Sequence, residues 1–179
     1  MAPDTTTRLS GIVKALEGVI IPALSEADSL AQEQAAIALS HLRMMSQLSD
    51  SDVEYEQHCL RKIESLAEDL VSSASGQGFT RERAESLARV LGSRGTEATR
   101  PRPSAAKRRR NEIARAIASL VEASGIDGDE SFVSTSQRLI LNHGKIQADL
   151  DRSRYAAAGL DPEAGTLPQF EALMSLDED

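Results

Sequence analysis

Residues 28–48 read DSLAQEQAAIALSHLRMMSQL, and residues 130–150, ESFVSTSQRLILNHGKIQADL, have the same pattern. Steps of four and three residues place one set of the first stretch on a single helical face. That set is Leu30, Gln34, Ile37, His41, Met44 and Leu48. A shift of 102 positions gives Phe132, Ser136, Leu139, His143, Ile146 and Leu150. Each stripe is apolar at four positions and carries a histidine, so we expect both to face a core.

The correspondence continues upstream of each stretch. Ile12 and Leu16 match Ile113 and Ile117 at a shift of 101. An internal repeat would give two antiparallel helix hairpins related by a pseudo-twofold axis. The alternative is that two unrelated amphipathic helices rich in Ala and Leu share a periodicity. The sequence leaves both open.

Composition favours helices throughout the chain. The 179 residues include no Trp and only 3% aromatic residues, and no run alternates with a period of two. Helical spacing predicts helices at residues 9–24, 28–48, 51–73, 80–91, 105–123 and 129–158, with a short segment from Phe170. Their core faces include Ile63, Leu66, Leu70, Ala84, Leu87, Ala88, Leu91, Ile113, Ile117 and Leu120. We predict an all-α fold, an antiparallel helical bundle of about six or seven helices.

The predicted domain is single and spans residues 1–179. Within it, residues 92–104 form a basic linker rich in Pro and Gly, and residues 160–179 form a flexible acidic tail. Thr80 is the predicted N-cap of the fourth helix, and Gly144, inside the last long helix, indicates close packing of another element.

Charge is distributed unevenly along the chain. Residues 81–115 contain 11 basic and four acidic residues, whereas both flanking regions are acidic. Four consecutive cations, Lys107 to Arg110, stand near the start of a predicted helix, where the helix dipole disfavours them. A nearby anion would relieve this: an acidic helix, another subunit or an anionic ligand. Nucleic acid is disfavoured, because the flanks are acidic and no aromatic residue is interleaved for stacking.

His41 and His143 are the candidate site residues of the two stripes. Each is expected to be at least half buried and to need a hydrogen-bond partner. If the hairpins pack about a twofold axis, the two imidazoles and Arg108, Arg109 and Arg110 could form a pocket for an anionic small molecule. Glu-x-x-His is absent, so we expect no metal and no cofactor. The competing interpretation is two core histidines.

Cys59 is the only cysteine, which excludes an internal disulfide and fits a reducing compartment. Its position predicts a small buried side chain rather than a catalytic thiol, since the adjacent His58 points about 100° away. No apolar run approaches the roughly 20 residues that span a bilayer, and the start lacks signal-peptide architecture. We therefore expect a cytoplasmic protein without a membrane segment.

The absence of a catalytic constellation favours a non-enzymatic protein that acts by association. Self-association as a homodimer or other homo-oligomer, binding of a protein partner, or both would suit an acidic–basic–acidic chain with many apolar helical faces. The alternative is a bundle or accessory subunit that binds an anionic small molecule near His41 and His143. Nucleic-acid binding through the basic segment ranks last.

Overall fold

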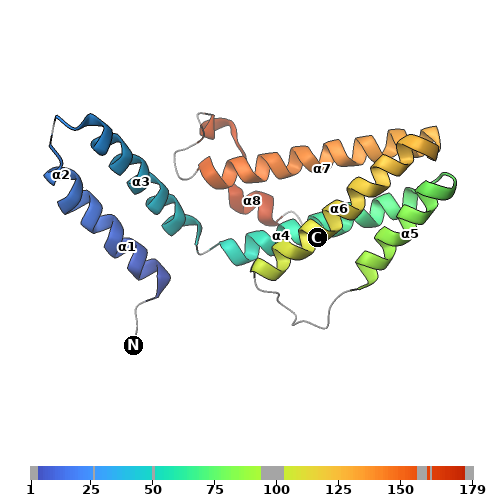
Figure 1. The fold of residues 1–179 in the computed structure, drawn as a ribbon, viewed down its shortest axis with the longest axis horizontal. Coiled ribbons are helices and arrows are strands. Elements are labelled where there is room, and N and C mark those ends of the chain that lie inside the picture. Colours follow the sequence, from blue (N-terminus) through green and yellow to red (C-terminus); the bar gives the residue numbers. More distant parts are fainter. Residues whose placement is uncertain are drawn as a thin grey trace. The chain divides into compact units, whose positions relative to one another are not determined.

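The computed structural model describes residues 4–25, 27–49, 51–93, 103–156, 161 and 163–175. Within these residues the chain is almost entirely helical and contains no strand (Figure 1). Six helices of eleven residues or more lie in this part of the chain, with shorter helical segments between and after them. The prediction of an all-α bundle of six or seven helices is confirmed.

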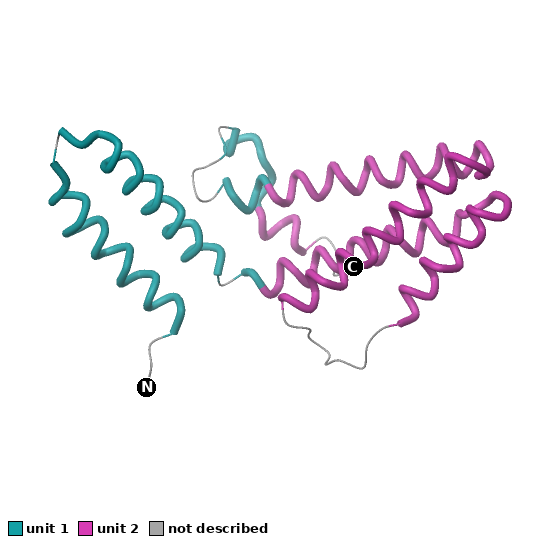
Figure 2. The backbone as a smooth tube through the Cα atoms, viewed as in Figure 1, with its two compact units in different colours: residues 1–52, 152–169 teal, residues 53–151, 170–179 magenta. Residues whose placement is uncertain are grey.

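Contacts group the chain into two compact units (Figure 2). Unit 1 comprises Met1–Asp52 and Arg152–Gln169, and unit 2 comprises Val53–Asp151 and Phe170–Asp179. The single domain over residues 1–179 stays a prediction. Most of the predicted linker at residues 92–104 lies outside the described residues. In the described part of the predicted tail at 160–179, a 3₁₀ turn at Ala164–Thr166 and helix α8 (Phe170–Ser175) are formed.

The long helices of unit 1 are α1 (Thr5–Ala15) and α3 (Ser29–Leu48), which pack as a hairpin (Figure 1). Asp4 and Asp28 cap them, accepting hydrogen bonds from the backbone N–H groups of Thr7 at 2.7 Å and Ala31 at 3.1 Å. Between them run a π-helical segment, Leu16–Ile20, and the short α2 (Ile21–Ala23). Pro22 lacks an N–H donor and its ring crowds the carbonyl four residues back, which accounts for a widened turn just before it.

The long helices of unit 2 are α4 (Asp52–Ser73), α5 (Gly78–Gly92), α6 (Pro103–Asp127) and α7 (Glu130–Ala156), of which α4 begins and α7 ends in unit 1. Their buried side chains form one core: Ile63, Leu66, Ala67, Leu70, Ala84, Leu87, Ile113, Ile117, Leu120 and Phe132. The core faces predicted for α4, α5 and α6 are therefore confirmed, except that Ala88 of α5 is exposed. A four-helix core closes because each helix contributes one apolar stripe.

Two turns far apart in the sequence are joined at one end of this core. The turn between α4 and α5 and the turn between α6 and α7 form an isolated antiparallel bridge between Gly76 and Gly128. Its backbone hydrogen bonds run from Gln77 N–H to the Asp127 carbonyl, 3.1 Å, and from Asp129 N–H to the Ser75 carbonyl, 3.0 Å. We call this bridge and its side-chain bonds the turn clasp. It ties the two helix pairs of unit 2 together.

Asp127 supplies the side-chain part of the turn clasp. Its carboxylate accepts hydrogen bonds from the backbone N–H groups of Phe79 at 2.7 Å and Thr80 at 2.9 Å, and from the Thr80 hydroxyl at 2.6 Å. The Thr80 hydroxyl bond is the main cause that lowers the pKa of Asp127. The prediction of Thr80 as the N-cap of α5 is wrong, because Asp127 caps the helix from another turn and lets it begin at Gly78.

Glycine is required at both positions of the bridge. A Cβ on Gly128 would lie 2.6 Å from the Ser124 carbonyl oxygen, and a Cβ on Gly76 would lie 2.8 Å from the Asp127 carbonyl oxygen. Gly144 differs, since no atom outside the neighbouring backbone of its own helix lies within 4 Å of the place its Cβ would take. Close packing at Gly144 was the wrong expectation: the residue is exposed on α7.

Candidate interaction surface

The first stripe, Leu30, Gln34, Ile37, His41, Met44 and Leu48, lies on the side of α3 that faces away from its buried residue. We call it the outer stripe. Leu39 is 8% exposed and is the buried residue of α3, whereas Leu30 is 66% and Ile37 43% exposed. Leu30 stands about 180° around the helix from Leu39, at 100° per residue. The prediction that this stripe faces a core within the chain is therefore wrong for its N-terminal half.

The reason for the error is that α3 has two apolar sides. Leu39 and the partly buried Leu42 lie on one side, and Leu30 and Ile37 lie on the other. Periodicity identifies residues that share a face, but it does not say which of two apolar faces a neighbouring helix covers. In the described part of unit 1, the hairpin leaves the outer stripe exposed from Leu30 to His41, whereas Met44 and Leu48 are partly buried. Other large apolar side chains of unit 1 are also exposed: Ile12, Val19, Ile20 and Met45.

The second stripe behaves as predicted at the end of α7 nearest the turn clasp and again at Leu150. Phe132 and Ser136 are each 1% exposed, and Leu150 is buried as well. Leu139 is partly buried against the unit 2 core, while Ile146 is exposed. The two aligned stretches therefore differ in burial in their first halves, whereas Met44 is partly buried and its aligned residue Ile146 is exposed. The repeat itself stays a prediction.

The two predicted site histidines belong to different units. His41 is exposed on α3 in unit 1, which contradicts its predicted burial. His143 is half buried on α7 in unit 2, and burial, followed by the charge of Lys62, lowers its pKa. Neither unit by itself contains the predicted two-histidine pocket.

The basic run at the start of α6 is partly used inside unit 2. The Arg109 guanidinium donates hydrogen bonds to the carbonyls of Val90 and Leu91 at the end of α5, and pairs with Glu112 at 2.8 Å. The last carbonyls of a helix are electronegative and lack intrahelical donors, so a guanidinium stabilises them. Arg110 pairs with Glu56 of α4 at 3.4 Å. Part of the positive charge of this run is therefore neutralised by Glu56, a carboxylate of the chain itself.

Lys107 and Arg108 complete the run. Both side chains are exposed, and neither forms an ion pair with another residue in the described ranges. Of the predicted anion-binding residues, Arg108 is the one that faces solvent. The sequence could not assign these roles, because two of the three acceptors of Arg109 are backbone carbonyls of a helix that ends more than ten residues earlier.

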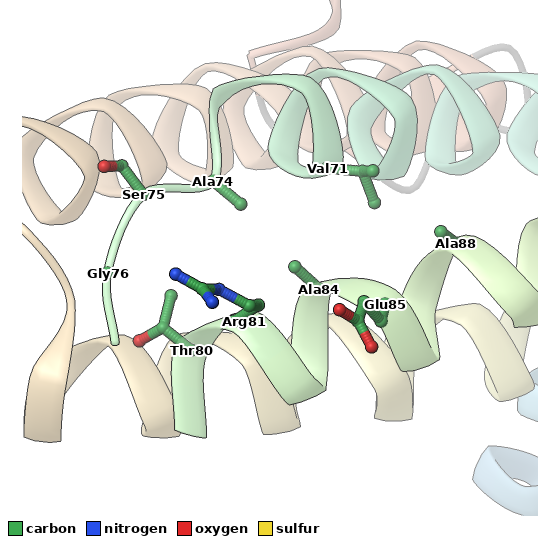
Figure 3. Close-up of a pocket in the computed structure, with 9 residues that line it drawn as sticks. All are labelled: Val71, Ala74, Ser75, Gly76, Thr80, Arg81, Ala84, Glu85 and Ala88. Atoms are coloured by element: carbon green, nitrogen blue, oxygen red, sulfur yellow. The ribbon is translucent and has the colours of Figure 1, made fainter. Parts of the chain in front are cut away.

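A groove of about 370 Å³ lies between α4 and α5 in unit 2. Figure 3 shows Val71 and Ala74 on one side, Ala84 and Ala88 on the other, and the guanidinium of Arg81 extending between them. Glu85 also lines the groove. Arg81 and Glu85 are the charged residues of a lining that is otherwise largely apolar, and no histidine lines the groove. The groove is therefore not the predicted anion pocket, and it was not predicted from the sequence.

A polar cluster joins α4 to α7 within unit 2. The Tyr55 hydroxyl donates to the Asp151 carboxylate, and the Gln147 amide donates to the same carboxylate at 2.8 Å and lies 3.4 Å from the Cys59 sulfur. Burial, then the hydrogen bond to Asp151, raises the pKa of Tyr55. Cys59 is buried, as predicted. A protonated phenol and a buried thiol make this cluster a structural contact between two helices.

Large apolar side chains are exposed in both units of the described chain: Leu30 and Ile37 on α3, and Phe79, Ile126 and Leu141 in unit 2. No three His, Cys, Asp or Glu side chains in this part of the chain are arranged to hold a metal ion. None of the described helices has the length and apolar character needed to cross a membrane. In comparisons with protein families, curated proteins and solved structures, the chain shows no significant similarity to any of them.

Proposed function

We propose that this protein acts by association, and that the outer stripe of α3 is the surface another helix covers. The observation that carries the proposal is the exposure of Leu30 and Ile37 on the side of α3 opposite Leu39. Isolated exposed apolar residues are common on protein surfaces. Here they follow a helical stripe with steps of four and three, which is the pattern of a helix–helix contact.

Energetics support a covered rather than a solvated stripe. Complete burial of a Leu or Ile side chain contributes about 1.5–3 kcal/mol each. A hairpin of two helices with Leu39 as its buried residue encloses little apolar surface of its own. Such elements gain most of their stability from packing against a further element. The role we propose is non-enzymatic, and the lone Cys59 is compatible with action in the cytoplasm.

The test is size-exclusion chromatography of native extracts from cells that produce the protein at a low level, which measures the native mass of the protein. We expect the wild-type chain to elute above the 19.3 kDa of a monomer. Ile37→Glu should elute as a monomer, because a carboxylate in the covered stripe would have to be desolvated.

The matched control is Ala36→Glu, which introduces the same charge one position away. Ala36 is exposed on the side of α3 that also holds Ser40 and Arg43, outside the outer stripe. We expect this variant to keep the mass of the wild-type assembly. A monomeric wild type, or equal masses for all three proteins, would contradict the proposal.

A further inference from the structure

We infer that the groove between α4 and α5 binds a small molecule that has one carboxylate and an aliphatic tail. The Arg81 guanidinium holds the carboxylate, and the apolar walls of the groove bury the tail. The groove volume of about 370 Å³ lies within the range of roughly 300–1,000 Å³ that is usual for small-molecule sites. The groove lies within unit 2, so this inference does not depend on the association proposed for α3.

Apolar side chains form both walls of the groove. Val71 and Ala74 stand on the α4 side, and Ala84 and Ala88 stand on the α5 side (Figure 3). Ala84 also belongs to the core of unit 2, whereas Ala88 is exposed. An aliphatic tail that lies between these two walls leaves water on both sides, and the loss of apolar surface from water favours its binding.

Arg81 supplies a positive charge in the groove that no other described residue neutralises. Its guanidinium extends between the two helices, on the side of Ser75 and Gly76 (Figure 3). It has neither an ion-pair partner nor a hydrogen-bond partner among the residues that the structure describes. A guanidinium presents parallel N–H donors that match the two oxygens of a carboxylate, so a carboxylate is the group that this end of the groove fits.

The acidic side chains near this end of the groove make other contacts. Asp127 accepts its three hydrogen bonds at the start of α5, and Asp129 accepts one from the Ser75 hydroxyl. Glu85 lines the groove four positions after Arg81, and the two side chains form no ion pair. The charge of Glu85 repels a second anionic group on the ligand. The groove should therefore select a monocarboxylate with an uncharged tail.

The test is isothermal titration calorimetry of the purified full-length chain with sodium octanoate, at concentrations too low for micelles. We expect the wild-type chain to bind octanoate. Arg81→Gln should weaken binding by about tenfold or more, because the carboxylate loses its charged partner. The matched control is Arg83→Gln, since Arg83 is exposed on the same helix and does not line the groove. This control should bind octanoate as the wild type does.

Tail length gives a second readout, which tests the apolar walls rather than Arg81. Burial of each methylene group should tighten binding about fourfold, so hexanoate should bind about 15-fold more weakly than octanoate. Equal binding of hexanoate and octanoate would show that the walls do not enclose the tail, and would overturn the inference.

Three further results would overturn the inference. The first is a wild-type chain that does not bind octanoate. The second is an equal effect of Arg81→Gln and Arg83→Gln on affinity, which would show that the net charge of the protein, and not the groove, governs binding. The third is tighter binding of octylammonium than of octanoate, because Glu85 rather than Arg81 would then hold the charged group.

Discussion

Helices α3 and α7 carry the same pattern of residues, but the first halves of the two patterns differ in burial. Phe132 on α7 is 1% exposed, and Leu30, at the aligned position on α3, is 66% exposed. In unit 2, α4, α5 and α6 supply three further apolar stripes, and the turn clasp holds the two helix pairs together. In unit 1, α1 covers only one side of α3. An amphipathic pattern therefore specifies a face to be buried, and the number of neighbouring helices decides whether the chain buries it alone.

Truncation of the aligned residues Phe132 and Leu30 should have very different effects on stability. We expect Phe132→Ala to destabilise unit 2 by about 3–5 kcal/mol, since it removes a fully buried aromatic side chain from the core. Leu30→Ala should change the free energy of unfolding by less than about 1 kcal/mol at low protein concentration. Urea unfolding followed by circular dichroism measures both. Equal losses would show that α3 is as enclosed as α7.

The turn clasp accounts for the closed core of unit 2, so disturbing it should open that core. Gly128→Ala would place a Cβ 2.6 Å from the Ser124 carbonyl oxygen, and we expect a loss of about 1–3 kcal/mol. Gly125→Ala is the matched control, because no atom outside the neighbouring backbone of its own helix lies within 4 Å of its added Cβ. Thermal unfolding compares the two. If Gly125→Ala proves the more damaging variant, the clasp is not the constraint we describe.

In unit 1, a substitution in the outer stripe should change the strength of association rather than the stability of the fold. His41→Leu replaces an exposed imidazole of the outer stripe with an apolar side chain. A gain of about 1.4 kcal/mol corresponds to a tenfold tighter dimer, and we expect an effect of that order. Sedimentation equilibrium of the purified protein measures it. Weaker association of His41→Leu would mean that the imidazole makes a specific polar contact in the complex.

His143 should make the stability of unit 2 depend on pH. Because burial lowers the pKa of His143 in the folded chain, the unfolded chain binds this proton more readily. Folding is unaffected by His143 well above about pH 6.5, and stability should fall as the pH drops through about 6.5 towards the lower folded pKa. His143→Gln should flatten this part of the curve of unfolding free energy against pH. A wild-type curve that rises on acidification would contradict the assignment.

The smallest expected effect is a gain in stability from Gly144→Ala. Gly144 is exposed in the middle of α7 with open space around it, so alanine reduces the entropy of the unfolded chain without a clash. We expect about 0.4–1 kcal/mol of stabilisation. Thermal unfolding checks the sign. A loss would show that another element approaches Gly144 in the assembled protein.

Much of the fold is predictable because helical periodicity is local. The spacing of Ile63, Leu66 and Leu70, and of Ile113, Ile117 and Leu120, identifies the core faces of α4 and α6 directly. The turn clasp is not predictable in this way. Gly76 and Gly128 each mark a turn, but their pairing depends on how two helix pairs distant in the sequence meet, which no local pattern encodes.

The candidate site was harder to predict, for two physical reasons. Burial of His41 was inferred from its stripe, but α3 has apolar residues on two sides, and α1 packs against the side that holds Leu39. The run at Lys107–Arg110 indicated an anion, yet Arg109 is held by backbone carbonyls, which carry no signature in the sequence. Arg108 stays a candidate for binding an anionic partner.

Amide hydrogen exchange of the purified full-length chain, at a series of protein concentrations, would separate a helix that packs within its own chain from one whose packing association completes. We predict that protection of residues 132–150 in α7 is independent of concentration, because unit 2 closes its own core. Protection of residues 30–48 in α3 should rise with concentration, because association through the outer stripe completes its packing. Protection of α3 that equals that of α7 at the lowest concentration, and does not change, would show that α3 needs no partner.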